Sequence, residues 1–282
     1  AVVDHMQQDN QSPLGKKKKP KPRSNLKDNP FLLERRKPCS EIVDDANVWL
    51  LKNHSFNVTS QNGEDGVVLK IMELLADGGN TMNKWCVEFG AWDGKHLSNT
   101  WSLINEHGWS SVQIEGDPEK FQELAARYCE NPKVTCIQTL VDFEGASSLD
   151  AILSATAIPK DPDVVCIDID GADYHVWESL ETHNPKLIIV EFNPTIPNHV
   201  AFVQPRSMSV HQGSSLLALV DLGKRKGYEL VCCTLFNAFF VPRRHLPLFQ
   251  LPDNSPGALH APTMATDLFQ LYDGTLVAAG CK

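Results

Sequence analysis

The sequence has no long hydrophobic run, no internal repeat and no strong compositional bias. No stretch approaches the roughly 18 apolar residues that a membrane-spanning helix requires. Hydrophobic residues make up 42% of the 282 residues, charged residues 22% and aromatic residues 8%, which is ordinary for a globular protein. The composition therefore excludes a membrane-spanning, collagen-like, coiled-coil or wholly disordered chain, and it leaves a globular domain of enzyme size.

The eight cysteines include no Cys-x-x-Cys pair, the spacing typical of redox and zinc sites. Five of them lie inside apolar, strand-like runs, namely Cys86, Cys136, Cys166, Cys232 and Cys233. This placement favours buried, reduced thiols and hence a cytoplasmic protein. Sequons at Asn10 and Asn57 would matter only in a secretory compartment, so the secretory pathway or Golgi lumen stays open as an alternative.

Positive charge is concentrated near the N-terminus. Residues 1–38 contain ten Lys or Arg against four Asp or Glu, although the whole chain has a net charge of −9. The rest is therefore strongly acidic, which argues against nucleic-acid binding, because phosphate binding requires a basic surface. The basic run at 16–23 predicts a disordered leader over 1–40, followed by one α/β domain over 41–282.

Other roles for this leader stay open. The basic run is also compatible with a nuclear signal, a membrane-surface contact or the stem of a truncated anchored protein. Since the chain begins with Ala1 and not with Met, we expect part of the leader to be missing or foreign to the protein.

Short β-branched runs alternate with amphipathic helical stretches from about residue 60 onward. The helices begin at typical caps, such as Asp117 followed by Pro118. The alternation predicts right-handed βαβ units in a doubly wound, mostly parallel, seven-stranded Rossmann-like sheet with an antiparallel hairpin at one edge. The proline-containing segment from Leu246 to His260 is expected to lie on the surface. The predicted strands are 85–89, 112–115, 134–138, 164–167, 187–190, 228–233 and 236–241.

Acidic residues stand where the predicted parallel strands end, and this is where open α/β sheets bind ligands. The first strand leads into Glu88-Phe89-Gly90-Ala91-Trp92-Asp93-Gly94, which is not the Gly-x-Gly-x-x-Gly fingerprint of dinucleotide sites. A carboxylate ahead of the first glycine suits a cationic group better than a phosphate. Glu115, which ends the second strand, can accept hydrogen bonds from both hydroxyls of a ribose. S-adenosylmethionine, a nucleoside with a positive charge, satisfies both features.

Two further strand ends carry acidic and amide groups that are expected to converge. Asp168 and Asp170 follow the fourth strand, and Glu191 and Asn193 follow the fifth. Oxygen ligands of this kind suit Mg²⁺ or a similar divalent cation, and carboxylates packed together need a counter-charge. A cation held by these four residues would lower the pKa of an acceptor hydroxyl. Alternatively, some of the carboxylates only accept hydrogen bonds from neighbouring loop amides.

Two histidines are candidates for a general base. His96 follows the glycine-containing loop, and His175 lies one turn into the helix after Asp170. A lone histidine in such a place is more often a surface or packing residue. Trp92 is placed either to stack on adenine or a substrate ring, or to cover the core.

Four segments resemble the successive motifs of FkbM-type methyltransferases. The resemblance covers roughly residues 60–242 and is most specific between Asp168 and Tyr174, where the family usually has Asp-x-Glu-Gly-x-Glu. This sequence has Asp170 and Asp173 in place of the two glutamates. A subgroup that shares Ser60-Gln61-Asn62-Gly63-Glu64-Asp65-Gly66 and Leu97-Ser98-Asn99-Thr100 is closer still. The four segments are Val87-Glu88-Phe89-Gly90, Ile114-Glu115-Gly116-Asp117, Ile167-Asp168-Ile169-Asp170-Gly171-Ala172-Asp173-Tyr174 and Ile189-Val190-Glu191-Phe192-Asn193.

The resemblance implies a class I methyltransferase fold with S-adenosylmethionine as methyl donor. It also implies an acceptor hydroxyl on a sugar or small molecule, so that the partner is a small-molecule or glycan acceptor. By position it implies three sets of cofactor contacts. The loop after the first strand contacts the cofactor, the end of the second strand contacts its ribose, and a residue past the third strand lies near its adenine. These residues are Glu88, Gly90, Ala91 and Gly94, then Glu115, then Asp142.

Two other functions stay open. A metal- and nucleotide-dependent transferase would use Asp168 and Asp170 to hold a metal–diphosphate. It would need a Lys or Arg near the phosphates, and residues 88–94 contain none, although Lys95 is adjacent. A non-catalytic binding or scaffold protein would keep the fold without the chemistry.

Overall fold

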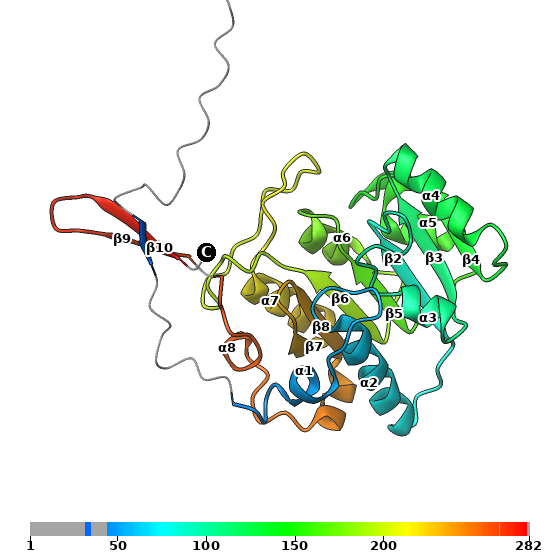
Figure 1. The fold of residues 1–282 in the computed structure, drawn as a ribbon, viewed down its shortest axis with the longest axis horizontal. Helices are drawn as coiled ribbons and strands as arrows, with labels where there is room; N and C mark the ends of the chain where they lie inside the picture. Colours follow the sequence, from blue (N-terminus) through cyan, green and yellow to red (C-terminus); the bar gives the residue numbers. More distant parts are fainter. Residues whose placement is uncertain (1–31, 35–43, 265, 281–282) are drawn as a thin grey trace, which may run out of the picture.

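The computed structural model describes residues 32–34, 44–264 and 266–280. Most of the predicted leader, including the basic run and the sequon at Asn10, lies outside these residues. The described part of the leader is β1 (Leu32–Glu34). It pairs in parallel with β10 (Leu276–Gly280), which pairs antiparallel with β9 (Thr266–Gln270). These strands form a small sheet apart from the main one (Figure 1). No helix in the described ranges is long and apolar enough to cross a bilayer.

Seven strands form the main sheet, in the order β4-β3-β2-β5-β6-β8-β7. Neighbouring strands from β4 to β6 are parallel, whereas β8 is antiparallel to both of its neighbours. The predicted doubly wound, mostly parallel, Rossmann-like sheet is confirmed, with an antiparallel hairpin at its edge. The bounds are Trp85–Phe89 for β2, Ser110–Glu115 for β3, Val134–Gln138 for β4, Val164–Ile167 for β5, Leu187–Glu191 for β6, Tyr228–Cys233 for β7 and Asn237–Pro242 for β8.

The direction of winding reverses between β2 and β5. The chain proceeds outward from β2 through β3 to β4, and then returns to the other side of β2 to form β5 and β6. Register aligns Phe89 with both Ile114 and Ile167, and Ile167 with Val190. The loops after these four strands therefore start at the same edge, where a reversal of strand order leaves a crevice.

Helices cover both faces of the sheet (Figure 1). The buried side chains of β5 alternate: Val164 and Cys166 belong to one hydrophobic cluster, and Val165 and Ile167 to the other. The first cluster includes residues of α1 (Trp49–His54), α2 (Glu64–Asp77), α3 (Trp101–Asn105) and α4 (Pro118–Tyr128). The second includes residues of α5 (Leu149–Ser154), α6 (Asp173–Ser179) and α7 (Leu216–Lys226).

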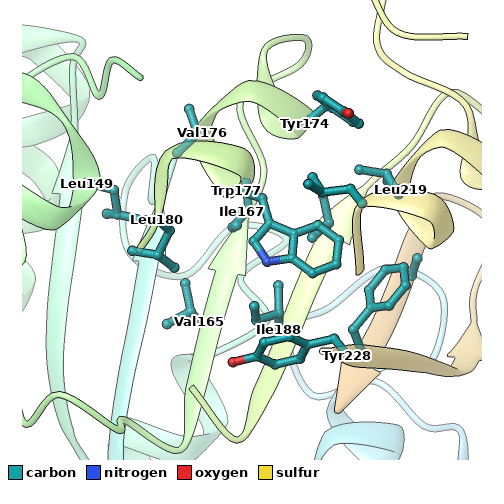
Figure 2. Packing of buried hydrophobic residues seen from close by; sticks show 14 of the residues in the cluster. Leu149, Val165, Ile167, Tyr174, Val176, Trp177, Leu180, Ile188, Leu219 and Tyr228 are labelled. Atoms are coloured by element: carbon teal, nitrogen blue, oxygen red, sulfur yellow. The ribbon is translucent and has the colours of Figure 1, made fainter. Parts of the chain in front are cut away.

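Trp177 of α6 is the largest side chain in the second cluster, and it is completely buried. Figure 2 shows its indole ring between Ile188 of the sheet and Leu219 of α7, with Tyr228 below it. Packing of this density against two strands and a helix fixes α6, and with it the loop that leads from β5 to α6.

The predicted helix ends are confirmed in two places. Asp117 Oδ1 accepts hydrogen bonds from the backbone nitrogens of Glu119 and Lys120, both at 2.9 Å, and Pro118 is the first residue of α4. Gly227 follows α7 with φ at +81°, a conformation that glycine adopts without strain.

The prediction that Leu246–His260 lies on the surface is correct only in part, because the segment carries both exposed and buried side chains. The segment contributes to the 3₁₀ helix η3 (Arg243–Phe249) and contains α8 (Pro256–Leu259). Phe249 and Leu259 are buried, one in each cluster. Pro247 lies inside η3 and Pro256 begins α8, so two of the three prolines shape short helices that cover the core, whereas Pro252 lies exposed between them.

Six cysteines lie in the described residues, and all six are free. Those in β2, β5 and β7 are buried, and burial raises the pKa of Cys86 and Cys232 to about 12. The thiolate is the reactive form of cysteine, so these side chains behave as apolar core residues, as the sequence predicted, whereas Cys136 of β4 is only half-buried.

Candidate functional site

A cavity of about 770 Å³ opens at the edge of the main sheet where the parallel strands end. Its volume lies within the range of small-molecule sites. Of the described residues that line it, seven are acidic and none is Lys or Arg. The wall therefore has the charge that suits a cationic ligand. The acidic residues are Glu64, Glu88, Glu115, Asp142, Asp168, Asp170 and Glu191.

The loop after β2 turns under the cavity at Gly90, which has a left-handed φ of +71°. A Cβ atom here would lie 2.1 Å from the carbonyl oxygen of Asp168, so only glycine lets the two loops approach this closely. Gly94 also has a positive φ but does not line the cavity. A Cβ atom there would lie 2.6 Å from Leu124, so this glycine lets the loop pack on α4.

Glu115 faces the cavity from the end of β3 and connects two loops. Its Oε2 accepts a hydrogen bond from Trp92 N and its Oε1 from Asp117 N, both at 2.7 Å. Each carboxylate oxygen has a second lone pair that remains available to a ligand. Asp142, which follows β4, also lines the cavity, and Trp92 stands at the rim with 47% of its surface exposed.

Glu88 lines the cavity, but the protein itself occupies its carboxylate. Its oxygens accept hydrogen bonds from Ser98 Oγ at 2.5 Å, Thr100 Oγ1 at 2.7 Å and Asn99 N at 2.8 Å. Burial raises the pKa of Glu88, and these three donors oppose that rise. Glu88 therefore fixes the segment 98–100, and its carboxylate has few lone pairs left for the cofactor contact that the resemblance implies.

Three of the four predicted metal ligands come together. Asp168, Asp170 and Glu191 each offer a carboxylate oxygen, and these oxygens all lie within 4.8 Å of one another. Burial, followed by the charges of the neighbouring carboxylates, raises the pKa of both Asp168 and Glu191. The arrangement is electrostatically unfavourable without a proton or a cation, as expected for carboxylates that share a small space.

The fourth predicted ligand, Asn193, does not line the cavity. Its Nδ2 donates to the carbonyl oxygen of Gln212 at 2.8 Å, and its Oδ1 accepts from the backbone nitrogen and hydroxyl of Thr195. The amide thus stabilises the start of the segment between β6 and α7, and the structure places it outside the cluster of acidic oxygens.

The second acidic residue of the Asp168–Tyr174 motif, Asp173, shapes the loop after β5. Its two oxygens accept hydrogen bonds from Ile169 N and Gly171 N, both at 2.9 Å. Burial raises its pKa to about 6 against these bonds. The loop is thereby held so that Asp170, with a left-handed φ of +55°, lines the cavity.

The two candidate bases differ in position. His96 lines the cavity and is exposed, whereas His175 is buried and is not part of the cavity wall. His175 Nε2 donates to the carbonyl oxygen of Gln204 at 2.9 Å, which connects α6 to the segment between β6 and α7. The structure therefore gives His175 an anchoring contact and keeps it away from any ligand in the cavity.

Sequence reasoning missed the residues that the segment between β6 and α7 brings to the cavity, Met208 and His211. Gln204 holds this segment: its Oε1 accepts from Gln212 N and Gly213 N, both at 3.0 Å, and its Nε2 donates to Val210 O at 2.9 Å. Nothing in the local sequence marks this turn, because the side chain that holds it, the Gln204 amide, lies six to nine residues away from its partners.

The segment Ser60–Gly66, which is part of the resemblance to the subgroup, leads into α2 beside the cavity. Asp65 Oδ2 accepts hydrogen bonds from three successive backbone nitrogens, those of residues 58–60, at 2.7–3.0 Å. Glu64 and Gln61 line the cavity beside it. Asn57 belongs to the sequon that lies within the described residues. Its Nδ2, the atom to which a glycan would be attached, donates to Gln61 O at 3.1 Å and is therefore part of this turn.

No protein-family model matches the sequence, and no curated protein does. Among solved structures, the chain is similar to a glycopeptide N-methyltransferase, MtfA, complexed with S-adenosylmethionine, at 14% identity over 60% of this chain and 85% of that one, with a TM-score of 0.33. It is also similar to the N-terminal domain of EvdMO1 in the presence of S-adenosylhomocysteine and D-fucose, at 12% identity over 68% and 90%, with a TM-score of 0.40.

A third similar structure is a methyltransferase dependent on S-adenosylmethionine from Aquifex aeolicus, at 11% identity over 60% of this chain and 87% of that one, with a TM-score of 0.34. At these identities and TM-scores the likeness carries no conclusion about chemistry.

Proposed function

We propose that the protein is an S-adenosylmethionine-dependent methyltransferase that methylates a hydroxyl of a sugar or small molecule. The observation that carries the proposal is the cavity at the switch point of the sheet, whose described lining has seven carboxylates and no Lys or Arg. A positively charged nucleoside is the ligand class that this combination of place and charge suits best.

The residues fit this cofactor. At Gly90 the backbone has no side chain between the loop and the cavity, and Glu115 keeps free lone pairs at the end of β3, where a ribose would present its two hydroxyls. Asp142 and Leu140 follow β4 and line the cavity there. They would give an adenine ring one polar and one apolar contact. When bound, the cofactor supplies a methyl group on a positively charged sulfur.

A divalent cation fits the donor set of Asp168, Asp170 and Glu191, because three carboxylate oxygens within 4.8 Å are hard ligands that need a counter-charge. Such an ion would stabilise negative charge on an acceptor oxygen. The protein's own part is to orient the acceptor hydroxyl toward the methyl carbon. Held near Gly90 and Glu115, the cofactor would supply the methyl carbon for the new carbon–oxygen bond, with a neutral thioether as its product. The hydroxyl proton would pass to a carboxylate oxygen of this group that does not hold the cation.

The cavity does not favour a nucleotide diphosphate. A diphosphate needs positive side chains or a run of free backbone nitrogens, and the described lining offers seven carboxylates without a Lys or Arg. The metal- and nucleotide-dependent transferase is for this reason the weaker of the two enzyme readings.

Glu115→Ala tests the proposed ribose contact. Since the variant removes a charged acceptor from two ribose hydroxyls, we expect the dissociation constant of S-adenosylhomocysteine to rise by about 10- to 100-fold in calorimetric titration. Gln138→Ala is the matched control, because Gln138 is aligned with Glu115 on the neighbouring strand but does not line the cavity. An unchanged constant for Glu115→Ala would refute the ribose role.

A further inference from the structure

The cavity is longer than the part that the proposed cofactor would occupy. Its lining extends from Glu115 at the end of β3, past Gly90 after β2, to Asp168, Glu191 and finally Asn237 at the start of β8. Four strand-to-strand steps separate β3 from β8, and at about 4.8 Å per step they span about 19 Å. The cofactor contacts proposed above lie on β2, β3 and β4, so the half over β5, β6 and β8 is left for the acceptor.

Asn237 is the polar residue of this second half whose hydrogen bonding is incomplete. It is 6% exposed and lines the cavity, and its Oδ1 is buried with no hydrogen-bond partner among the described residues. An unpaired buried carbonyl oxygen is costly unless a ligand supplies the missing donor. The structure holds this oxygen ready to accept a hydrogen bond.

The orientation of the Asn237 amide is fixed by its neighbours. Its Nδ2 donates to Glu64 Oε1 at 3.4 Å, and that oxygen also accepts from Thr234 Oγ1 at 2.7 Å. The other oxygen of Glu64 accepts from Asn62 N at 2.6 Å. Rotating the amide by half a turn would place Oδ1 against the carboxylate of Glu64, so the atom of Asn237 that lacks a partner is an acceptor and not a donor.

Register brings this acceptor next to the proposed reaction centre. Glu191 of β6 pairs directly with Asn237 of the antiparallel strand β8. Side chains of directly opposed residues project from the same face, with Cβ atoms about 5 Å apart. The Asn237 oxygen and the acidic oxygens of the candidate metal ligands can therefore contact neighbouring groups of one small acceptor.

We propose that Asn237 Oδ1 accepts a hydrogen bond from a second hydroxyl of the acceptor, so that the site selects polyhydroxylated acceptors in which a free hydroxyl neighbours the one that is methylated. This inference rests on the proposed function. A single sugar ring has this pattern, whereas a simple alcohol or a phenol without a neighbouring donor does not. Gln61 and Asn99, which also line the cavity, add amide groups that suit further hydroxyls.

The test is binding of methyl glycosides in the presence of S-adenosylhomocysteine, measured by saturation-transfer NMR with the full chain. The probes are the methyl glycosides of glucose, galactose, mannose, fucose and xylose, with the monodeoxy analogues of the one that binds best. We expect at least one parent glycoside to bind, and one deoxy position to weaken its binding about tenfold, because the unpaired oxygen of Asn237 then stays buried.

Asn237→Leu should weaken the parent glycoside by a similar factor and should no longer distinguish it from that deoxy analogue. S-adenosylhomocysteine should bind this variant within twofold of the original chain, which also shows that the variant is folded. Asn184→Leu, at an exposed amide outside the cavity, is the matched control and should change nothing. If Asn237→Leu fails to fold, the deoxy series on the original chain decides.

Two outcomes would overturn the inference alone: S-adenosylhomocysteine binds but none of the glycosides does, or no deoxy analogue loses affinity and Asn237→Leu binds the parent normally. Failure of S-adenosylhomocysteine to bind the original chain would remove the proposed function, and the inference with it. The two failures are therefore distinguishable in one set of titrations.

Discussion

Replacing Asp168 and Asp170 together by asparagine is expected to abolish methyl transfer while leaving the affinity for S-adenosylhomocysteine within about twofold. The two carboxylates lie over β5, beyond the proposed ribose and adenine contacts, and form the acidic group with Glu191. Loss of two ligands would remove the cation and the electrostatic stabilisation of the reacting oxygen, so a decrease of at least about 1,000-fold is expected. The measurement is transfer of labelled methyl groups to the glycoside that binds best.

Unfolding would not explain such a loss. Carboxylates that repel one another at close range destabilise the fold, so the variant should unfold at the same or a higher temperature than the original chain. Asp77→Asn with Asp221→Asn makes the same change in net charge at exposed helical positions and should keep full activity. Treatment with a chelator should also stop transfer, and Mg²⁺ should restore it. Activity that persists without divalent cations would remove the metal from the account.

Gly90→Ala is expected to lower both stability and cofactor affinity. A left-handed conformation costs a residue with a Cβ roughly 1–2 kcal/mol, and an overpacked contact adds about 1–3 kcal/mol. At Gly90 both apply, because φ is +71° and the new Cβ would lie 2.1 Å from the Asp168 carbonyl oxygen. The free energy of unfolding should therefore fall by about 2–5 kcal/mol in urea titration, and S-adenosylhomocysteine should bind at least about tenfold more weakly.

Gly145→Ala is the matched control, because Gly145 has a φ of +70° and a Cβ atom there would have no neighbour within 4 Å. It should show the conformational cost alone, about 1–2 kcal/mol, with normal cofactor affinity. Equal effects of the two substitutions would mean that the close approach of the loops after β2 and β5 is unimportant for the site.

The fold and the edge that carries the site were predictable because both depend on local patterns. Continuous apolar runs such as Leu187–Val190 indicate central parallel strands, and all parallel strands end at one edge. A side chain placed directly at such an end, such as Glu115 or Asp168, reaches the cavity whatever the loops do.

Residues two or more positions beyond a strand end were less predictable, because their side chains follow contacts that are distant in the sequence. Asn193 turns away from the cavity to meet Gln212, and His175 turns to meet Gln204. Distant contacts also affect Glu88, although it lies within β2. It lines the cavity, but donors from ten to twelve residues further along the chain occupy its oxygens.

The acceptor half of the cavity could not be predicted for a related reason. It depends on the antiparallel pairing of β8 with β6, which sets Asn237 opposite Glu191, and on α2, whose Glu64 lies 173 positions from Asn237 and meets it only in the fold. No spacing in the sequence brings these three residues together.

Calorimetric titration of the original chain with S-adenosylmethionine, S-adenosylhomocysteine and UDP-glucose tests the central claim most directly, namely that the acidic cavity binds a positively charged nucleoside or its thioether product. Binding of the first two at a single site, with no heat from UDP-glucose, is the result that the geometry of Gly90 and Glu115 predicts. No binding heat from either S-adenosyl compound, or binding heat from UDP-glucose alone, would contradict it.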